Sequence, residues 1–174
     1  MTTDRSAPSP STQALGLTST RIDGLDFIAT RVFDAPRTLV FRAFSDCADL
    51  VHWWGPKGWT LPVCEMDFRT GGTWNYCMQS PEGEKSCGAS TYREIVEPER
   101  IVYTDAFTDA DGAPIADTPE MVVTVTFADV DGRTTLASIV RFATAKDLDV
   151  AAGFGMEQGL IETWDRLEAH LAAK

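Results

Sequence analysis

The feature that most constrains this chain is a series of six strand-like segments that fills most of its length after residue 58. Short turn signals such as Gly71-Gly72 and Asp131-Gly132 separate neighbouring segments. Connections this short cannot contain the crossover that parallel strands need, so the pattern predicts antiparallel neighbours in a meander. Apolar and polar residues alternate over 121–127, which predicts one buried sheet face. The six segments are 59–68, 73–79, 86–96, 100–107, 120–130 and 133–143.

Other elements are predicted on either side of this series. A strand over 25–35 ends at Pro36, and two short helices follow at 36–46 and 47–54. The last segment, 146–174, predicts a long amphipathic helix because Leu160, Trp164, Leu167 and Leu171 form one stripe. Glycines destabilise a helix interior, so those in its first half predict a kink, a late start or close packing against the sheet. These glycines are Gly153, Gly155 and Gly159.

Together these elements predict a single α+β domain over residues 23–174, preceded by a flexible leader over 1–22 that is rich in Ser, Thr and Pro. We expect a curved antiparallel sheet to wrap around the long C-terminal helix and to bury its apolar stripe. The two short helices after the first strand would close one end. A cavity would then lie between the long helix and the concave face of the sheet.

Composition excludes several classes of function. The formal net charge is −11 and no Lys or Arg cluster is present, so no nucleic-acid partner is expected. No apolar run approaches the roughly 18 residues that a membrane span needs. The N-terminus lacks the apolar core of a secretory signal, so a cytoplasmic location is the default expectation.

Four cysteines leave the redox state open. They form no C-x-x-C pair and the chain has only two histidines, so neither a metal site nor a cofactor is expected. Cys77 and Cys87 flank the turn at 81–84 and could face each other across a hairpin. We favour the alternative, in which these two are small half-buried strand residues in a reducing compartment. The other two are Cys47 and Cys64.

Several stretches of the chain resemble a known family, the activator of heat-shock-protein-90 ATPase homologue-like domains of the START and Bet v 1-like (SRPBCC) helix-grip superfamily. The resemblance covers about residues 26–173 and implies a helix-grip fold with a hydrophobic tunnel for an apolar or aromatic small molecule. Leu160 and Trp164 have exchanged bulk relative to the family pattern, so the shape of the ligand is not carried over. The matching stretches are FDAPRTLVFRAFSD, LVHWWGP, MDFRTGGTWNYCM, PEGE, GASTYREIVEPERIVYTD and GLIETWDRLEAHL.

Aromatic residues supply the candidate ligand site. Trp74, Tyr76 and Met78 share one face of their strand, and we expect this bulky set to point inward and to form a wall. No catalytic residue is singled out. The predicted ligand-binding residues are Trp54, Trp74, Tyr76, Met78, Tyr92, Tyr103, Val123, Val125, Phe154, Leu160 and Trp164.

Two phenol and carboxylate pairs could carry chemistry. Tyr92 with Glu94, and Tyr103 with Asp105, each lie on a common strand face. If they point inward, such pairs could bind a polar tip of a ligand or act as acid and base. We favour the outward orientation, because buried carboxylates are scarce.

The cluster LVHWWGPKGWT at 50–60 is interpreted mainly as packing. Trp53 and Trp54 end a short helix, where they would plug one end of the sheet with at most one indole reaching the cavity. His52 has no neighbouring nucleophile and is expected to be exposed or capping. Asp67 and Arg69 are expected to brace the Gly71-Gly72 turn.

Three functions remain open at this stage. The first is a small-molecule binding domain for a hydrophobic or aromatic ligand, without catalysis. The second is an enzyme of the cyclase, dehydratase or hydrolase kind, with a tunnel-facing Tyr or carboxylate. The third is a chaperone cofactor or stress-response module. We expect no additional domain like the one that precedes this module in the eukaryotic co-chaperone, which weakens the third. Aromatic residues outside the core could also support a homodimer.

Overall fold

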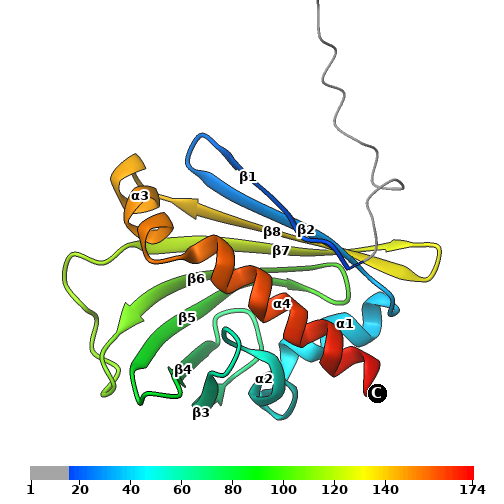
Figure 1. The fold of residues 1–174 in the computed structure, drawn as a ribbon, viewed down its shortest axis with the longest axis horizontal. Helices are drawn as coiled ribbons and strands as arrows, with labels where there is room; N and C mark the ends of the chain where they lie inside the picture. Colours follow the sequence, from blue (N-terminus) through cyan, green and yellow to red (C-terminus); the bar gives the residue numbers. More distant parts are fainter. Residues whose placement is uncertain (1–15) are drawn as a thin grey trace, which may run out of the picture.

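A computed structural model describes residues 16–174 as an eight-stranded antiparallel sheet with four helices (Figure 1). The strands lie in the order β1-β2-β8-β7-β6-β5-β4-β3, so the predicted meander is confirmed as the run from β3 to β8. The strands are β1 Ser19–Asp23, β2 Asp26–Phe33, β3 Thr60–Met66, β4 Thr73–Gln79, β5 Lys85–Val96, β6 Arg100–Thr108, β7 Glu120–Val130 and β8 Arg133–Phe142. The helices are α1 Arg37–Ser45, α2 Cys47–Trp53, α3 Ala145–Gly153 and α4 Met156–Ala172. The α+β helix-grip fold is therefore confirmed.

The chain reaches both edges of the sheet early. After β2, helices α1 and α2 carry it to β3 at the far edge, and the meander then returns until β8 pairs with β2. Strand β1 was not predicted, because residues 19–22 fall within the expected leader and their side chains show no buried face. Backbone pairing with β2 holds this strand in the sheet. The part of the expected leader at residues 1–15 lies outside the described residues.

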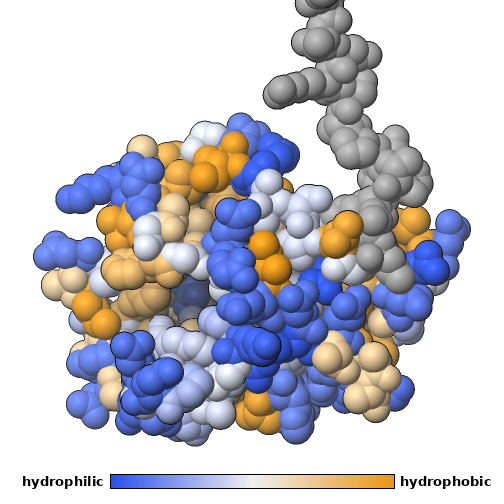
Figure 2. Space-filling model, in the orientation of Figure 1, coloured by the Kyte–Doolittle hydropathy of each residue, from blue (hydrophilic) through white to orange (hydrophobic). Residues whose placement is uncertain are grey.

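Helix α4 crosses the concave side of the sheet and presents hydrophilic side chains outward (Figure 2). Of the alternatives for the glycine-containing half, the structure shows an interruption of the helix: Gly155 adopts a left-handed conformation with φ 80° and separates α3 from α4. The predicted stripe is also confirmed, with Trp164, Leu167 and Leu171 buried and Leu160 partly buried. None of the helices in residues 16–174 combines the length and apolarity needed to cross a membrane.

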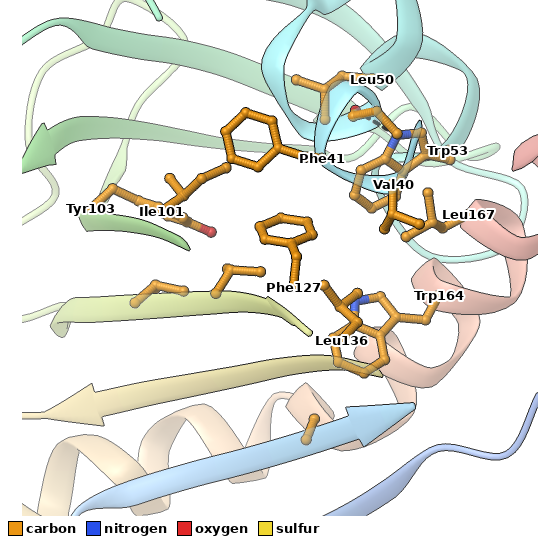
Figure 3. Packing of buried hydrophobic residues seen from close by; sticks show 14 of the residues in the cluster. Val40, Phe41, Leu50, Trp53, Ile101, Tyr103, Phe127, Leu136, Trp164 and Leu167 are labelled. Carbon is orange, nitrogen blue, oxygen red and sulfur yellow. Dashed lines mark hydrogen bonds between the residues drawn. The ribbon is translucent and has the colours of Figure 1, made fainter. Parts of the chain in front are cut away.

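The core lies between the C-terminal half of α4, helix α1 and the adjacent strands (Figure 3). The ring of Phe127 on β7 packs edge-on against Phe41 and Phe44 of α1, with centroid distances of 5.2 Å in both pairs. Phe33 of β2 meets Trp164 of α4 at 6.1 Å. The first two contacts hold α1 against the sheet and the third holds α4, because aromatic pairs add to the free energy gained from burying area.

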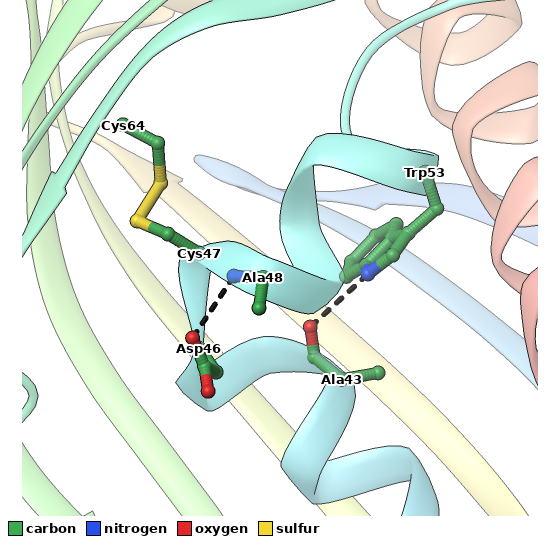
Figure 4. The surroundings of a disulfide bond; sticks show 6 residues. All are labelled: Ala43, Asp46, Cys47, Ala48, Trp53 and Cys64. Atoms are coloured by element: carbon green, nitrogen blue, oxygen red, sulfur yellow. Dashed lines mark hydrogen bonds between the residues drawn. A yellow bond between two sulfur atoms is a disulfide. The ribbon is translucent and has the colours of Figure 1, made fainter.

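Trp53 is part of this core. It is 0% exposed, and its indole Nε1 donates a hydrogen bond to the Ala43 carbonyl at 3.0 Å (Figure 4). Helix α2 begins where the Asp46 carboxylate accepts a hydrogen bond from the Ala48 backbone N–H at 2.9 Å. The expectation that Trp53 is packing is therefore confirmed.

The preference for reduced Cys77 and Cys87 is wrong, and a disulfide between Cys47 and Cys64 was not foreseen. Cys47 and Cys64 form a disulfide between α2 and β3 (Figure 4), and Cys77 and Cys87 form another across β4 and β5. Cys77 and Cys87 are direct partners in the strand register, as the rejected hairpin alternative required. The error came from the assumed compartment, since geometry alone favours bonding. Disulfides persist mainly in oxidising compartments, so the expectation of a cytoplasmic location loses support.

Candidate functional site

A cavity of about 290 Å³ lies between the first half of α4 and the concave face of the sheet. Figure 2 shows a hollow beside α4 on this side of the molecule. The volume is at the lower end of the range for small-molecule sites. The lining residues are Phe44, Trp54, Gly55, Pro56, Tyr76, Met78, Tyr103, Asp105, Phe107, Met121, Val123, Val125, Ser138, Val140, Met156, Gly159, Leu160, Thr163 and Trp164.

Strand alternation supplies the apolar wall. Met121, Val123 and Val125 are every second residue of β7, so all three point to the concave face. Val140 of β8 lies directly opposite Val123 and extends the same wall. Helix α4 supplies the opposite wall with Met156, Leu160 and Trp164, which recur at helical spacing.

A carboxyl group, Asp105 of β6, interrupts this apolar lining. The Tyr76 hydroxyl donates to both of its oxygens, at 3.0 Å to Oδ2 and 3.2 Å to Oδ1. The Ser90 hydroxyl also donates to Oδ1, at 3.1 Å. Strand register explains the second contact, because Ser90 of β5 is the direct partner of Asp105. The cavity wall therefore carries a polar group that is itself held by two hydroxyls.

Gly88 makes the hydrogen bonds between Tyr76 and Asp105 possible. Tyr76 lies on β4, and its direct partner on β5 is Gly88, so its ring must cross β5 to reach β6. A Cβ atom at position 88 would lie 2.5 Å from the Tyr76 hydroxyl oxygen. Only glycine leaves room for the phenol to lie across the intervening strand and to bind Asp105.

The surroundings shift the ionisation of these groups. Burial raises the pKa of Asp105 to about 6, although hydrogen bonds from Tyr76, Ser90 and the Ala106 backbone oppose the rise. Asp105 is partly buried and lines the cavity, so its side chain can be reached from there. Burial and the nearby Asp105 charge raise the pKa of Tyr76 and of Tyr103 well above the ordinary value, so both phenols remain hydrogen-bond donors.

Most of the residues predicted for the site do line this cavity. Two others lie behind the lining: Trp74 is 3% exposed and packs 4.4 Å from Tyr76, and Tyr92 is 2% exposed and packs 6.1 Å from Tyr103. Phe154 lies outside the cavity and is 84% exposed, because it occupies the break between α3 and α4. The eight lining residues are Trp54, Tyr76, Met78, Tyr103, Val123, Val125, Leu160 and Trp164.

The preference for outward phenols and carboxylates is wrong in three of four cases. Tyr92, Tyr103 and Asp105 point to the concave side, and only Glu94 lies toward the surface, where it pairs with Arg100. A register shift between Tyr92 and Glu94 separates that pair. The general scarcity of buried carboxylates did not apply, since two hydroxyls satisfy Asp105.

A signal for the buried carboxyl was present in the sequence but was not used. Gly88 and Ser90 fall on the same face of β5 as Tyr92, and a small residue followed by a hydroxyl leaves room for a polar contact on a sheet face. Ser138 and Thr163 also line the cavity and were missed. Their hydroxyls sit among apolar neighbours, and nothing in the spacing marked them as lining residues.

Arg166 of α4 positions the loop at residues 54–56, which brings Trp54 to the cavity. Its guanidinium donates hydrogen bonds to the carbonyls of Gly55 at 2.9 Å, Pro56 at 3.2 Å and Trp54 at 3.4 Å. Desolvation lowers the pKa of Arg166, but an arginine stays charged in a protein. This contact holds the 54–56 loop against α4, so Trp54 lines the cavity while Trp53 stays in the core. The expectation that at most one of these two indoles reaches the cavity is confirmed.

The other polar predictions concern the surface. His52 is exposed, and its ring stacks on His170 at 5.4 Å, so it takes no part in the cavity. Arg69 Nε donates to Asp67 Oδ2 at 2.8 Å, which confirms that this pair braces the turn at Gly71. Within residues 16–174, no group of three or more His, Cys, Asp or Glu side chains could hold a metal ion.

A curved antiparallel sheet that grips a C-terminal helix around a cavity defines a helix-grip domain of the START and SRPBCC class. Within that class, the model of the family described as activator of Hsp90 ATPase homolog 1-like protein matches residues 34–172. The chain belongs to this family, as its resemblance predicted.

Solved structures agree with this assignment. Protein Ms6760 from Mycobacterium smegmatis is 29% identical, with a TM-score of 0.84 over 90% of this chain and 97% of that one. A protein from Arthrobacter aurescens is 30% identical, with a TM-score of 0.82 over 90% of this chain and 92% of that one. Protein NE0264 from Nitrosomonas europaea is 25% identical, with a TM-score of 0.77 over 87% and 97%. No curated protein sequence matches the chain at the significance required.

Proposed function

We propose that this domain binds a small hydrophobic or aromatic molecule in the cavity between α4 and the sheet. The observation that carries the proposal is a 290 Å³ apolar cavity whose wall holds one carboxyl group, that of Asp105. Ligand sites are typically concave and mainly apolar, with a few placed polar groups that orient the ligand. Valine, leucine and aromatic side chains would bury the ligand's apolar surface, and Asp105 would fix its orientation.

Gly159 provides a direct test, because it lines the cavity from α4. A Cβ atom there would meet only Pro56 Cγ, at 3.8 Å, so a side chain is tolerated. Gly159→Leu is expected to fill the cavity and to abolish ligand binding. Its helix propensity should offset part of any packing cost, because replacing glycine in a helix interior contributes up to about 1 kcal/mol. Gly159→Ala is the matched control, since it gains propensity but leaves most of the cavity open.

The experiment is a thermal-shift screen of aromatic, lipid and polyketide compounds, followed by calorimetric titration of the hits. At a ligand concentration of 100 Kd, binding should add about 2.7 kcal/mol to the free energy of unfolding. The proposal predicts hits that bind wild type and Gly159→Ala but not Gly159→Leu. It fails if no compound binds, or if the hits bind Gly159→Leu equally well.

A second candidate is acid–base catalysis on the bound molecule, and the pKa of Asp105 favours it. A carboxyl whose pKa is about 6 exchanges protons near neutral pH and is accessible from the cavity, as a general acid or base requires. The test incubates each hit with wild type and with Asp105→Asn and follows conversion by mass spectrometry. Conversion by wild type alone would support an enzyme. Recovery of every hit unchanged would leave binding as the function.

A chaperone partner ranks below both. The family description names the Hsp90 ATPase, but a name carried by the family does not identify a partner of this chain. The feature that the described residues supply is a lined cavity, which suits a small molecule better than a protein surface. Loss of binding on filling the cavity would separate the two, because a protein partner would contact the outside of the domain.

A further inference from the structure

The cavity wall carries one carboxylate, and no positively charged side chain among the described residues lies against it. Asp105 is the one Asp, Glu, Lys, Arg or His among the lining residues, and within residues 16–174 no cationic side chain forms an ion pair with it. Its hydrogen-bond donors are the hydroxyls of Tyr76 and Ser90 and the Ala106 backbone, all neutral.

The two charged side chains that are most deeply buried within residues 16–174 are both paired. Arg31 is 1% exposed, and its guanidinium meets Asp165 at 2.7 Å and Glu168 at 2.8 Å. Asp49 is buried, and its carboxylate meets Lys174 at 2.6 Å and His170 at 2.8 Å. A buried charge without a counter-charge is costly, which is why such groups are normally paired. Asp105 departs from this pattern at the wall of the cavity.

We propose that the cavity selects a compact hydrophobic amine, bound as its cation with the ammonium group against Asp105. This inference rests on the proposed function and specifies its ligand class. An ammonium group would supply the missing counter-charge and donate hydrogen bonds. A carboxylate has about four acceptor sites, and Tyr76 supplies a single proton shared between both oxygens, so acceptor capacity remains for a ligand.

The aromatic lining favours the same class of ligand. Trp54, Tyr76 and Tyr103 line the cavity with Asp105, and ring faces attract an ammonium group within about 6 Å. The apolar remainder, including Val123 and Leu160, suits the hydrocarbon part of such a ligand. The formal net charge of −11 attracts cations at long range and disfavours the approach of anions.

The pH dependence separates a cation from a neutral ligand. Asp105 must be ionised to bind an amine, so amine affinity should fall as the pH drops below about 6. A neutral carbonyl compound would instead accept a hydrogen bond from protonated Asp105, and its affinity should rise over the same range. The ionisable groups around Asp105 are Tyr76, Tyr92 and Tyr103, whose pKa values are raised. The lining residues of α4, β7 and β8 carry no charge, and an alkylammonium stays protonated up to about pH 10.

The test compares three probes of matched shape: 2-phenylethylamine, 2-phenylethanol and phenylacetate. Calorimetric titrations at pH 7.5 and pH 5 would use wild type, Asp105→Asn and the control Glu120→Gln. Glu120 is an exposed residue of β7 outside the lining, so the control removes one negative charge without touching the cavity. We expect wild type and Glu120→Gln to bind the amine at least tenfold more tightly than the alcohol at pH 7.5, and to lose most of that preference at pH 5. Asp105→Asn should bind amine and alcohol alike.

Equal affinity of wild type for the amine and the alcohol, or tighter binding of phenylacetate, would overturn the inference while leaving the proposed function intact. An unchanged amine preference in Asp105→Asn would overturn it as well. The pH titration of wild type needs no variant, so it decides the matter even if Asp105→Asn does not fold. Failure of all three probes to bind would overturn the ligand class proposed here, whereas the proposed function fails only if the wider screen also yields no hit.

Discussion

At the residue scale, the site depends on the absence of a side chain at Gly88. Tyr76 reaches Asp105 only because its cross-strand partner has no side chain, and Ser90 completes the contact from the next inward position of β5. Alternation predicted that Tyr76 points inward. It could not predict that Asp105 does so too, because the stabilising hydroxyls come from two other strands whose register is set only in the folded sheet.

Substituting Gly88 by alanine should therefore break the Tyr76 contact with Asp105. The new Cβ would lie 2.5 Å from the phenol oxygen, so the ring must move. We expect a loss of about 1 to 3 kcal/mol in the free energy of unfolding. The pKa of Asp105 should rise further above about 6, since one donor to the carboxylate is lost. Urea unfolding and a carbon-13 NMR titration of Asp105 would measure the two effects.

Tyr76→Phe is the matched comparison, because it removes the same hydroxyl without crowding β5. It should raise the pKa of Asp105 in the same direction. If Gly88→Ala leaves the pKa of Asp105 where it is in wild type, while Tyr76→Phe raises it, the close approach of Tyr76 to position 88 is not what limits this contact.

The raised pKa of Asp105 also predicts how stability depends on pH. The folded protein holds this proton up to about pH 6, whereas an ordinary aspartate releases it near 3.8. The contribution of Asp105 to stability is therefore full below about pH 4 and is lost as the pH rises through 6. The loss is limited to about 3 kcal/mol, at about 1.4 kcal/mol for each unit of pKa difference.

Asp105→Asn removes this titration. The difference in unfolding free energy between wild type and Asp105→Asn should therefore shift in favour of the variant between about pH 4 and 6, and it should be flat above about 7. Denaturant unfolding at half-unit pH steps measures the curve. A difference that stays constant across this window would show that Asp105 titrates normally.

At the scale of elements, Arg166 joins three parts of the fold. It lies on α4 and binds the carbonyls at the end of α2 and in the loop before β3, which places Trp54 in the cavity wall. The helical pattern predicted α4 and its buried stripe correctly. It gave no sign of the role of Arg166, because spacing along one helix does not show which loop folds over it.

Arg166→Met should loosen the 54–56 loop without emptying the space beside it. Four backbone carbonyls would lose a charged donor, so we expect a loss of about 2 to 4 kcal/mol in the free energy of unfolding. Hydrogen exchange at amides of residues 54–59 should quicken by more than exchange in β7. Arg166→Lys, which keeps the charge but not the fork of donors, should show an intermediate effect. Uniform quickening throughout the domain would indicate a global rather than a local role.

At the scale of the whole molecule, the sequence was sufficient for the meander, the two short helices and the helix that the sheet grips. Periodicity carries that information, because the apolar face of each element must be buried. Strand β1 was missed because it is held by backbone pairing with exposed side chains. The Cys77–Cys87 disulfide was misjudged because a reducing compartment was assumed, and the Cys47–Cys64 disulfide was not foreseen because its two cysteines lie on different elements.

The central claim is that the cavity itself takes the ligand, and methyl NMR tests it most directly. A hit from the screen would be titrated into protein with labelled Val and Leu methyl groups. We expect saturable shifts at Val123, Val125 and Leu160, which line the cavity, and none at the exposed Val63 of β3. In Gly159→Leu these shifts should disappear. Shifts confined to surface methyls such as Val63, or shifts that persist in Gly159→Leu, would contradict a ligand site inside the grip.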